Sequence, residues 1–275
     1  MSPVDDAQVP LTAEAASLGP RLAVGKQAEV FAWGETQVLK LFFDPRSRGS
    51  VEYEAGTARA VHATGVRCPA VGEVIELNGR FGLIYERVDG PSMGADLLSR
   101  PWRTGRLGCR LAEMQVEVHA VRAPAELPSL HDRFGDKIRS APLSDRLRDA
   151  ALAALDALPR GDALCHADFH PFNVIITAHG PVTIDWNDSA RGDPAGDIAW
   201  TWLSIASATI PLRLAPVLLV RDWLCRAYRR RRLELTPLAP DLFARWLVVA
   251  AAARSADDNC NLRWCRRLAA RGLLG

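Results

Sequence analysis

The chain changes character at Gly90-Pro91, and this change limits the folds that it can adopt. Before that point the sequence alternates as short strands do, and Trp33-Gly34-Glu35-Thr36 and Asn78-Gly79 are typical hairpin turns. The expected strands cover residues 21–25, 29–34, 36–43, 70–77 and 79–88, with one helix over 51–64. After that point, composition and spacing predict helices over 102–121, 143–158, 194–208, 213–233, 238–254 and 256–270. We therefore expect an α+β fold, with a small antiparallel sheet in residues 1–88 and a larger helical lobe in residues 89–275.

The composition argues against several classes of protein. Hydrophobic residues make up 48% of the 275, which excludes disorder as the dominant state, and a net charge of +2 gives no overall attraction to nucleic acid or membrane. The longest uncharged run, residues 198–212, is too short to span a bilayer and predicts a buried helix. The N-terminus has no apolar core like that of a secretory signal, and the six cysteines form no CxxC pair. We expect a cytoplasmic monomer or weak dimer with reduced thiols.

A short strand-rich island, residues 164–186, interrupts the helices and concentrates polar chemistry. Its two strands, 173–177 and 181–185, meet at His179-Gly180 as a hairpin, which would bring Asp168, Asn173 and Asp185 around one point. Two hard oxygen ligands in this arrangement suit a Mg²⁺ ion that is shared with substrate phosphates. The third carboxylate could then accept a proton from an attacking hydroxyl.

These residues resemble a known family. His166-Ala167-Asp168 with Asn173, followed by Ile184-Asp185-Trp186, is similar to the catalytic loop and metal-binding aspartate of the aminoglycoside phosphotransferase and choline kinase family. Members of that family are small-molecule relatives of protein kinases. The similarity extends in order over residues 21–200, through the segments 25–30, 38–40, 84–87, 192–194 and 197–199. It implies a protein-kinase-like two-lobe fold, with a nucleotide-binding N-lobe over 1–88 and a catalytic and substrate-binding C-lobe over 89–275.

The resemblance also implies roles for individual residues. ATP would lie with its adenine at the hinge, and Lys40, oriented by Glu54, would hold its phosphates. Asn173 and Asp185 would bind Mg²⁺, and Asp168 would orient a substrate hydroxyl and accept its proton. The nucleotide-contacting candidates are Gly25, Gln27, Ala28, Lys40, Glu54, Tyr85, Glu86, Arg87 and Val88.

Three departures from the family pattern bear on function. Ala167 and Phe172 stand where the family commonly has glycine, and Asp197 follows Asp185 after only twelve residues, without an activation segment. We therefore expect an ATP-dependent kinase of a small-molecule hydroxyl, an aminoglycoside or other antibiotic, rather than a protein or lipid kinase. The alternatives are a choline or amino-alcohol kinase and a catalytically silent nucleotide-binding module.

Other interpretations of these residues stay open from sequence. Glu52 could pair with Lys40 in place of Glu54, and Lys40 could be an ordinary edge-strand lysine. His166 fits a structural brace better than a general base. His166, Asp168 and His170, with Cys165, could suggest zinc, but the spacing fits no common zinc pattern.

Two further segments have weaker functional interpretations. Residues 19–26 superficially resemble a phosphate-binding P-loop, but the spacing between their glycines differs from that of a P-loop. The arginine cluster within 226–232 fits a solvated helix face better than a nucleic-acid or membrane patch, because Tyr228 is its only aromatic. We expect no nucleic-acid or membrane partner.

The charge of the C-terminal region bears on the acceptor. Residues 211–275 contain thirteen arginines, no lysine and five acidic residues, a poor balance for attracting a polycation. If the acceptor carries amines, Asp188, Asp257 and Asp258 are the candidate partners. Alternatively, Asp257 and Asp258 would simply favour the N-terminus of the last helix.

Overall fold

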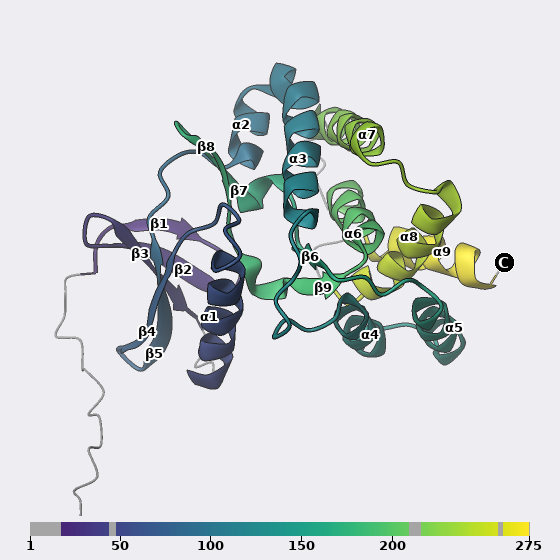
Figure 1. Cartoon of the computed structure of the whole chain (residues 1–275), viewed down its shortest axis with the longest axis horizontal. Helices are drawn as coiled ribbons and strands as arrows, with labels where there is room; N and C mark the ends of the chain where they lie inside the picture. The colour runs from purple at the N-terminus through teal and green to yellow at the C-terminus, as the bar shows by residue number, and fades with distance from the viewer. Residues whose placement is uncertain (1–17, 44–47, 209–215, 258–260, 275) are drawn as a thin grey trace, which may run out of the picture. The chain divides into compact units, whose positions relative to one another are not determined.

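The computed structural model describes residues 18–43, 48–208, 216–257 and 261–274. The chain divides into two compact units (Figure 1). The first contains residues 1–59 and 69–87, and the second contains residues 60–68 and 88–275.

The first unit is built on a five-stranded antiparallel sheet in the order β1-β2-β3-β5-β4. Its strands are β1 (Arg21–Val24), β2 (Ala28–Trp33), β3 (Gln37–Phe42), β4 (Val71–Leu77) and β5 (Arg80–Glu86). Both predicted hairpins are confirmed. Gly34 has a φ of 64°, and Asn78 and Gly79 have φ values of 53° and 75°, as a tight turn between twisted strands requires. The predicted antiparallel sheet is therefore present.

The two faces of β3 have different neighbours because successive side chains point to opposite sides of a strand. Leu39 and Leu41 pack in one apolar cluster with Ile84 of β5. Phe42 packs on the other face, with Val51 and Ala55 of α1 (Arg48–His62). Lys40 shares the face of Phe42, so its side chain points toward the helix.

The described part of the second unit is mostly helical. Its α-helices are α2 (Met93–Ser99), α3 (Thr104–His119), α4 (Leu130–Ser140), α5 (Asp145–Asp156), α6 (Pro194–Ser207), α7 (Pro216–Leu235), α8 (Pro240–Arg254) and α9 (Leu262–Leu274). α6 joins two apolar clusters: Trp200 and Leu203 pack with α4, α5, α8 and α9, whereas Ile198 and Ile205 pack with α2, α3 and α7. Because α6 is buried on both sides, its sequence carries no charge after Asp197, which explains the uncharged run that begins at residue 198. Among the described helices, none combines the length and apolarity needed to cross a bilayer.

Two small sheets hold the loop segments of the second unit. β6 (Ala163–Cys165) pairs with β9 (Ala190–Gly192), and β7 (Val174–Thr177) pairs with β8 (Gly180–Thr183). The β7–β8 pair is the predicted hairpin. The 3₁₀ turns η2 (Pro171–Asn173) and η3 (Trp186–Asp188) flank it, and η1 (Pro101–Arg103) precedes α3.

Several elements differ from the sequence-based expectation. α2, α4 and the three-residue strands β6 and β9 were not predicted. The last helix begins at Leu262, not at 256, so Asp257 follows the end of α8 rather than opening α9. The proposed helix-N-terminus role of Asp257 is therefore wrong. Asp258 lies outside the described residues.

Candidate functional site

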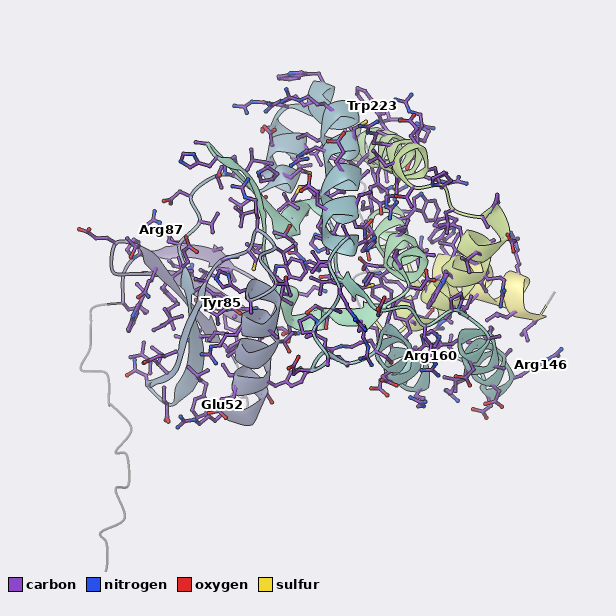
Figure 2. All side chains as sticks on the ribbon, viewed as in Figure 1. Glu52, Tyr85, Arg87, Arg146, Arg160 and Trp223 are labelled. Carbon is purple, nitrogen blue, oxygen red and sulfur yellow. The ribbon has the colours of Figure 1, made fainter. Side chains whose placement is uncertain are left out.

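Lys40 and Glu54 form an ion pair within the first unit. Lys40 Nζ lies 2.7 Å from Glu54 Oε1, and the Glu54 side chain is only 2% exposed. The Tyr85 hydroxyl also donates to Glu54 Oε1, at 3.4 Å. Glu52 is instead exposed on α1 and pairs with Arg48 at 2.8 Å (Figure 2). Glu54, and not Glu52, is therefore the carboxylate that pairs with Lys40. Because β3 lies inside the sheet, Lys40 is not an ordinary edge-strand lysine.

The predicted phosphate loop is the short turn between β1 and β2. Gly25 N–H donates to Ala28 O at 2.8 Å, and Phe43 N–H donates to Gln27 O at 2.9 Å. The turn leaves Gly25 and Gln27 exposed, while the Ala28 side chain is buried in the core. The position is compatible with a loop whose backbone contacts a ligand.

The predicted hinge follows β5. Glu86 N–H donates to Ala70 O, and Arg87 N–H donates to Thr36 O, each at 2.9 Å. These two N–H groups are therefore already used within the first unit.

In the second unit, the loop and hairpin bring together the backbone positions of Asp168, Asn173 and Asp185. Asn173 Nδ2 donates to Asp168 O at 3.0 Å. Ile184 N–H donates to Asn173 O at 2.9 Å, which places Asp185 beside the same segment. The hairpin register brings Asp185 beside Asn173, and the bond from Asn173 to Asp168 O links the loop to the same segment.

Two residues of this segment have left-handed backbone conformations. Ala167 has a φ of 59°, and Asp185 has a φ of 62° and a ψ of 61°. Such a conformation is strained for alanine and better tolerated by aspartate. This backbone requirement explains why glycine is common in the family at the position of Ala167. Phe172, the other departure, is largely exposed and needs no such explanation.

Asp168 is held in its charged form. Burial raises the pKa of its carboxyl, but nearby basic groups together outweigh this effect, first His170, whose Nε2 lies 3.5 Å from Asp168 Oδ2, and also Arg254. The pKa is lowered to about 2. The side chain is still 32% exposed, so the carboxylate can meet a ligand from solvent.

His166 acts as a brace. Its ring is fully buried, 4.5 Å from the Trp186 ring centroid. Nδ1 accepts from Asp168 N–H at 3.2 Å, so Nε2 carries the proton and donates to Ile184 O at 3.1 Å. Both nitrogens are occupied, which argues against a zinc ligand.

Among the described residues, one group of side chains has metal-ligand spacing, namely His119, Cys165 and Asp197. Burial raises the pKa of the Cys165 thiol well above its ordinary value, with Asp197 and Asp193 adding to the effect. A protonated thiol is a poor ligand. The His119 and Asp197 atoms are already hydrogen-bonded to each other at 2.8 Å, so this group is a polar network rather than a metal centre.

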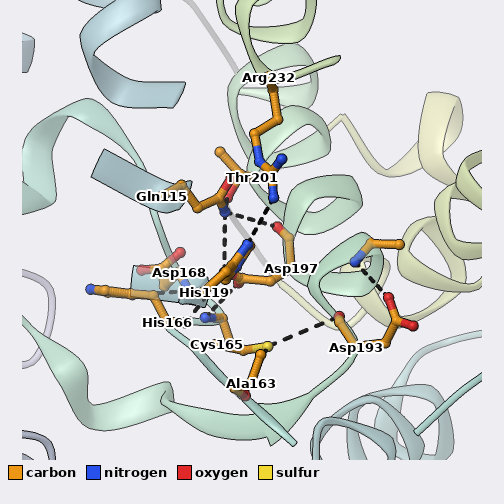
Figure 3. Close-up of polar contacts among 12 residues, drawn as sticks. Gln115, His119, Ala163, Cys165, His166, Asp168, Asp193, Asp197, Thr201 and Arg232 are labelled. Atoms are coloured by element: carbon orange, nitrogen blue, oxygen red, sulfur yellow. Dashed lines mark hydrogen bonds and ion pairs between the residues drawn. The ribbon is translucent and has the colours of Figure 1, made fainter. Parts of the chain in front are cut away.

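Asp197 is the residue whose contribution sequence reasoning missed. Its fully buried carboxylate accepts the N–H of Ala167 at 2.8 Å. It also accepts the N–H of His166 at 3.3 Å (Figure 3). Burial raises the pKa of Asp197, but the hydrogen bonds from His119 and Ala167 hold it below its ordinary value. The family pattern marked this aspartate, yet the two backbone N–H groups that it accepts lie 30 and 31 residues earlier in the chain, which no side-chain pattern indicates.

The predicted acceptor carboxylates have different surroundings. Burial, followed by Asp168 and Asp185, raises the pKa of Asp188, while Lys137 and Arg133 oppose the rise. Asp188 therefore lies within electrostatic range of the catalytic candidates. Asp257 is instead neutralised by ion pairs with Lys137 at 2.9 Å and Arg254 at 2.6 Å. An amine-bearing ligand would have to displace two cations to reach it.

The arginine cluster of α7 is distributed over separate contacts. Arg231 pairs with Glu113 of α3 at 2.9 Å, and Arg230 lies 3.5 Å from Glu234. Arg229 lies over the Phe243 ring, and Arg232 is buried. These four arginines of the cluster therefore have separate partners.

The comparisons with known proteins agree with this geometry. Residues 21–235 match the phosphotransferase enzyme family. No curated protein matches the sequence. Three similar solved structures each align over most of this chain and most of their own.

The first is a thermostable mutant of aminoglycoside phosphotransferase APH(4)-Ia in ternary complex with ADP and hygromycin B, with 16% identity, a TM-score of 0.65 and 94% coverage of each chain. The second is a choline/ethanolamine kinase family protein from Mesorhizobium loti, with 20% identity, a TM-score of 0.55 and coverage of 97% of this chain and 90% of that one. The third is the amicoumacin kinase hAmiN in complex with AMP-PNP, Ca²⁺ and Ami, with 15% identity, a TM-score of 0.56 and coverage of 93% and 86%.

The folds of these structures confirm the expected protein-kinase-like α+β class. The family match spans well over half of the chain and includes the loop and hairpin described above. The chain therefore belongs to the phosphotransferase enzyme family, and it is a small-molecule kinase, a phosphotransferase that acts on hydroxyl groups.

Proposed function

We propose that this chain transfers the γ-phosphoryl group of ATP to a hydroxyl of an amine-bearing small molecule, with an aminoglycoside or other antibiotic as the first candidate. Residues 1–88 would serve the nucleotide, and residues 89–275 would supply the catalytic and acceptor-binding groups. The observation that carries the proposal is the arrangement of Asp168 and Asn173 on one loop, joined through Ile184 to Asp185.

In this proposal Asp168 orients the acceptor hydroxyl. The hydroxyl oxygen forms a bond to the γ-phosphorus while the bond between that phosphorus and the bridging oxygen breaks, which releases ADP. The proton of the hydroxyl passes to Asp168. Because the pKa of Asp168 is about 2, the carboxylate is a weak base, and we expect the proton to move late, once the new P–O bond has largely formed.

Asn173 and Asp185 are suited to hold Mg²⁺. Both offer hard oxygen ligands, and the bond from Asn173 Nδ2 to Asp168 O turns the amide oxygen away from that carbonyl. When bound, the ion would neutralise phosphate charge. The left-handed conformation of Asp185 sets the direction of its exposed carboxylate.

On the nucleotide side, Lys40 would contact the α- and β-phosphates, with Glu54 fixing its ammonium group. The turn at Gly25, Gln27 and Ala28 would cover the phosphates. Since the N–H groups of Glu86 and Arg87 are already used, adenine recognition would rely on the Val88 N–H and on the hinge carbonyls, with Tyr85 behind them.

The proposed class of acceptor is supported by the ligands and names of similar structures and by the surroundings of Asp188. Similar structures bind hygromycin B or amicoumacin, and one belongs to the choline/ethanolamine kinases. Since Asp257 is neutralised within the protein, Asp188 is the carboxylate best placed to receive a substrate amine. One such carboxylate also suits a monoamine, so a choline or amino-alcohol acceptor is the second candidate.

The test is ADP release with Mg-ATP across a panel of aminoglycosides, other hydroxyl-bearing antibiotics, choline and ethanolamine. Asp168→Asn serves as the inactive control, and Asp162→Asn, an exposed aspartate of the same unit, serves as the matched active control. Acceptor-dependent ADP release that is lost in Asp168→Asn and kept in Asp162→Asn supports the proposal. Nucleotide binding with no phosphate transfer to any acceptor would instead favour the silent nucleotide-binding alternative.

A further inference from the structure

A buried chain of hydrogen bonds connects α7 to the catalytic loop (Figure 3). Arg232 Nη2 lies 3.2 Å from His119 Nδ1, and His119 Nε2 lies 2.8 Å from Asp197 Oδ2. Asp197 in turn accepts the N–H groups of His166 and Ala167, directly before Asp168. All of these residues belong to the second unit.

The last link of this chain holds a strained backbone. Ala167 has a φ of 59°, a left-handed conformation that is unfavourable for alanine. Its N–H is held at 2.8 Å by Asp197 Oδ1. If Asp197 rotated or shifted, the peptide could relax toward negative φ, and the Asp168 side chain would change direction. The position of Asp168 therefore depends on how firmly Asp197 is held.

The first link determines the orientation of His119. A guanidinium group can only donate, so Nδ1 of His119 must accept from Arg232. The ring proton must then lie on Nε2, where it is donated to Asp197. Gln115 donates to the same carboxylate oxygen at 3.1 Å and is itself held by the Tyr228 hydroxyl. Arg232 thus selects the one neutral tautomer of His119 that supports Asp197.

The burial of Arg232 argues that it is not there for stability alone. Its side chain is 3% exposed, and within the described part of the chain its Nε and Nη1 atoms find no hydrogen-bond partner. Burying a charged group with unsatisfied donors is unfavourable, and an apolar residue of similar size is often more stabilising at such a site. A locally unfavourable residue of this kind is typical of a functional site.

We propose that Arg232 and His119 are positioning residues for phosphoryl transfer, which act through Asp197 to fix the catalytic loop and hence Asp168. The proposal rests on the assignment of Asp168 to the catalytic step. Neither residue would contact nucleotide or acceptor, so their loss should lower kcat and leave both Michaelis constants nearly unchanged.

The central variant is Arg232→Met, with Arg231→Met as its matched control. Arg231 is the preceding residue on α7 and also links to α3, through Glu113, but at the surface. We expect Arg232→Met to lower kcat about 10- to 100-fold, the effect of a small misplacement of a catalytic group. Arg232→Lys keeps a donor for His119 and should recover most of kcat. Arg231→Met should keep wild-type kcat.

A double-mutant cycle separates positioning from general destabilisation. His119→Leu removes the residue through which Arg232 acts, so adding Arg232→Met to it should lower kcat by no more than about twofold further. Full additivity of the two losses, wild-type kcat in Arg232→Met, or equal losses in Arg231→Met and Arg232→Met would overturn the proposal.

Backbone hydrogen exchange gives a readout that does not depend on catalysis. In Arg232→Met, amide exchange in the segment 164–173 should accelerate, whereas Arg231→Met should leave it unchanged. If the wild type phosphorylates no acceptor, the proposed function fails, but this exchange comparison still decides whether Arg232 holds the loop. Unchanged exchange in Arg232→Met would overturn the positioning role even in an active enzyme.

Discussion

The side-chain amide of Asn173 donates to the carbonyl oxygen of Asp168, its neighbour five residues earlier on the loop, at 3.0 Å. The bond ties a metal-ligand candidate to the backbone of the residue that would receive the substrate proton. Asn173 Nδ2 also lies 3.4 Å from Asp168 Oδ2, but its shorter bond is to the main chain, so a change confined to the carboxylate leaves that bond in place.

Asp168→Asn should therefore retain the loop and nucleotide affinity while lowering kcat by about 100- to 10,000-fold, the range for loss of a general base. Isothermal calorimetry with a nonhydrolysable ATP analogue and steady-state ADP release would measure the two quantities. Near-normal kcat in this variant would remove Asp168 from the mechanism.

Asp185→Asn should weaken Mg-dependent nucleotide binding by at least about tenfold, because it removes the charged metal ligand. Asparagine tolerates the left-handed conformation at this position, so the variant tests charge without adding backbone strain. Nucleotide affinity measured with EDTA is the control and should not change. A loss of affinity that persists without metal would point to a structural defect.

Glu54→Gln should raise the Michaelis constant for ATP about tenfold or more, since Lys40 would lose the charge that orients its ammonium group. Glu52→Gln is the matched control on the same helix and should behave like the wild type, because Glu52 is exposed and pairs with Arg48 at the surface. Equal effects of the two substitutions would contradict the assignment of Glu54.

Ala167→Gly should leave the free energy of unfolding unchanged or raise it by at most about 1 kcal/mol. Glycine relieves the strain at a φ of 59° but adds conformational entropy to the unfolded chain. Ala167→Val should destabilise the protein by more than about 2 kcal/mol, because a β-branched residue fits this conformation poorly. Urea denaturation of both variants tests the pair, and equal stability of the two would contradict the conformation described here.

Asp188→Asn should raise the Michaelis constant for an amine acceptor while leaving that for ATP unchanged. Because burial raises the pKa of Asp188, its carboxyl becomes neutral at a higher pH than an ordinary aspartate as pH falls. The wild-type Michaelis constant for the amine should therefore rise toward acidic pH, and that rise should be absent in the variant. A pH profile of both proteins with the same acceptor is the measurement, and parallel profiles would favour a neutral acceptor.

Structural roles that depend on a local sequence pattern could be predicted from the sequence. The Asn78-Gly79 turn requires positive φ at both positions, and the alternation in β3 directs Lys40 to the helix side. Whether Glu52 or Glu54 pairs with Lys40 depends on which side of α1 faces β3, and residue spacing alone does not determine this.

Other features depend on contacts distant in sequence or on elements with little local signal. β6 and β9 are three residues each, too short for a periodic pattern, and α4 contains Gly135 and several charges. Asp257 looked like a helix opener because polar and apolar residues continue without a break into α9. One of its two ion-pair partners, Lys137, lies 120 residues earlier, beyond the reach of any sequence window.

The position of Asp197 in the first turn of α6 limits how this enzyme could acquire a new acceptor in evolution. α6 belongs to both apolar clusters of the second unit, so a core substitution that shifts its N-terminus also shifts the loop amides. Such changes would lower turnover for every acceptor alike. Residues 187 and 188 do not hold the loop amides, and a directed-evolution library that randomises these two positions can change acceptor preference while residues 166–168 stay in place.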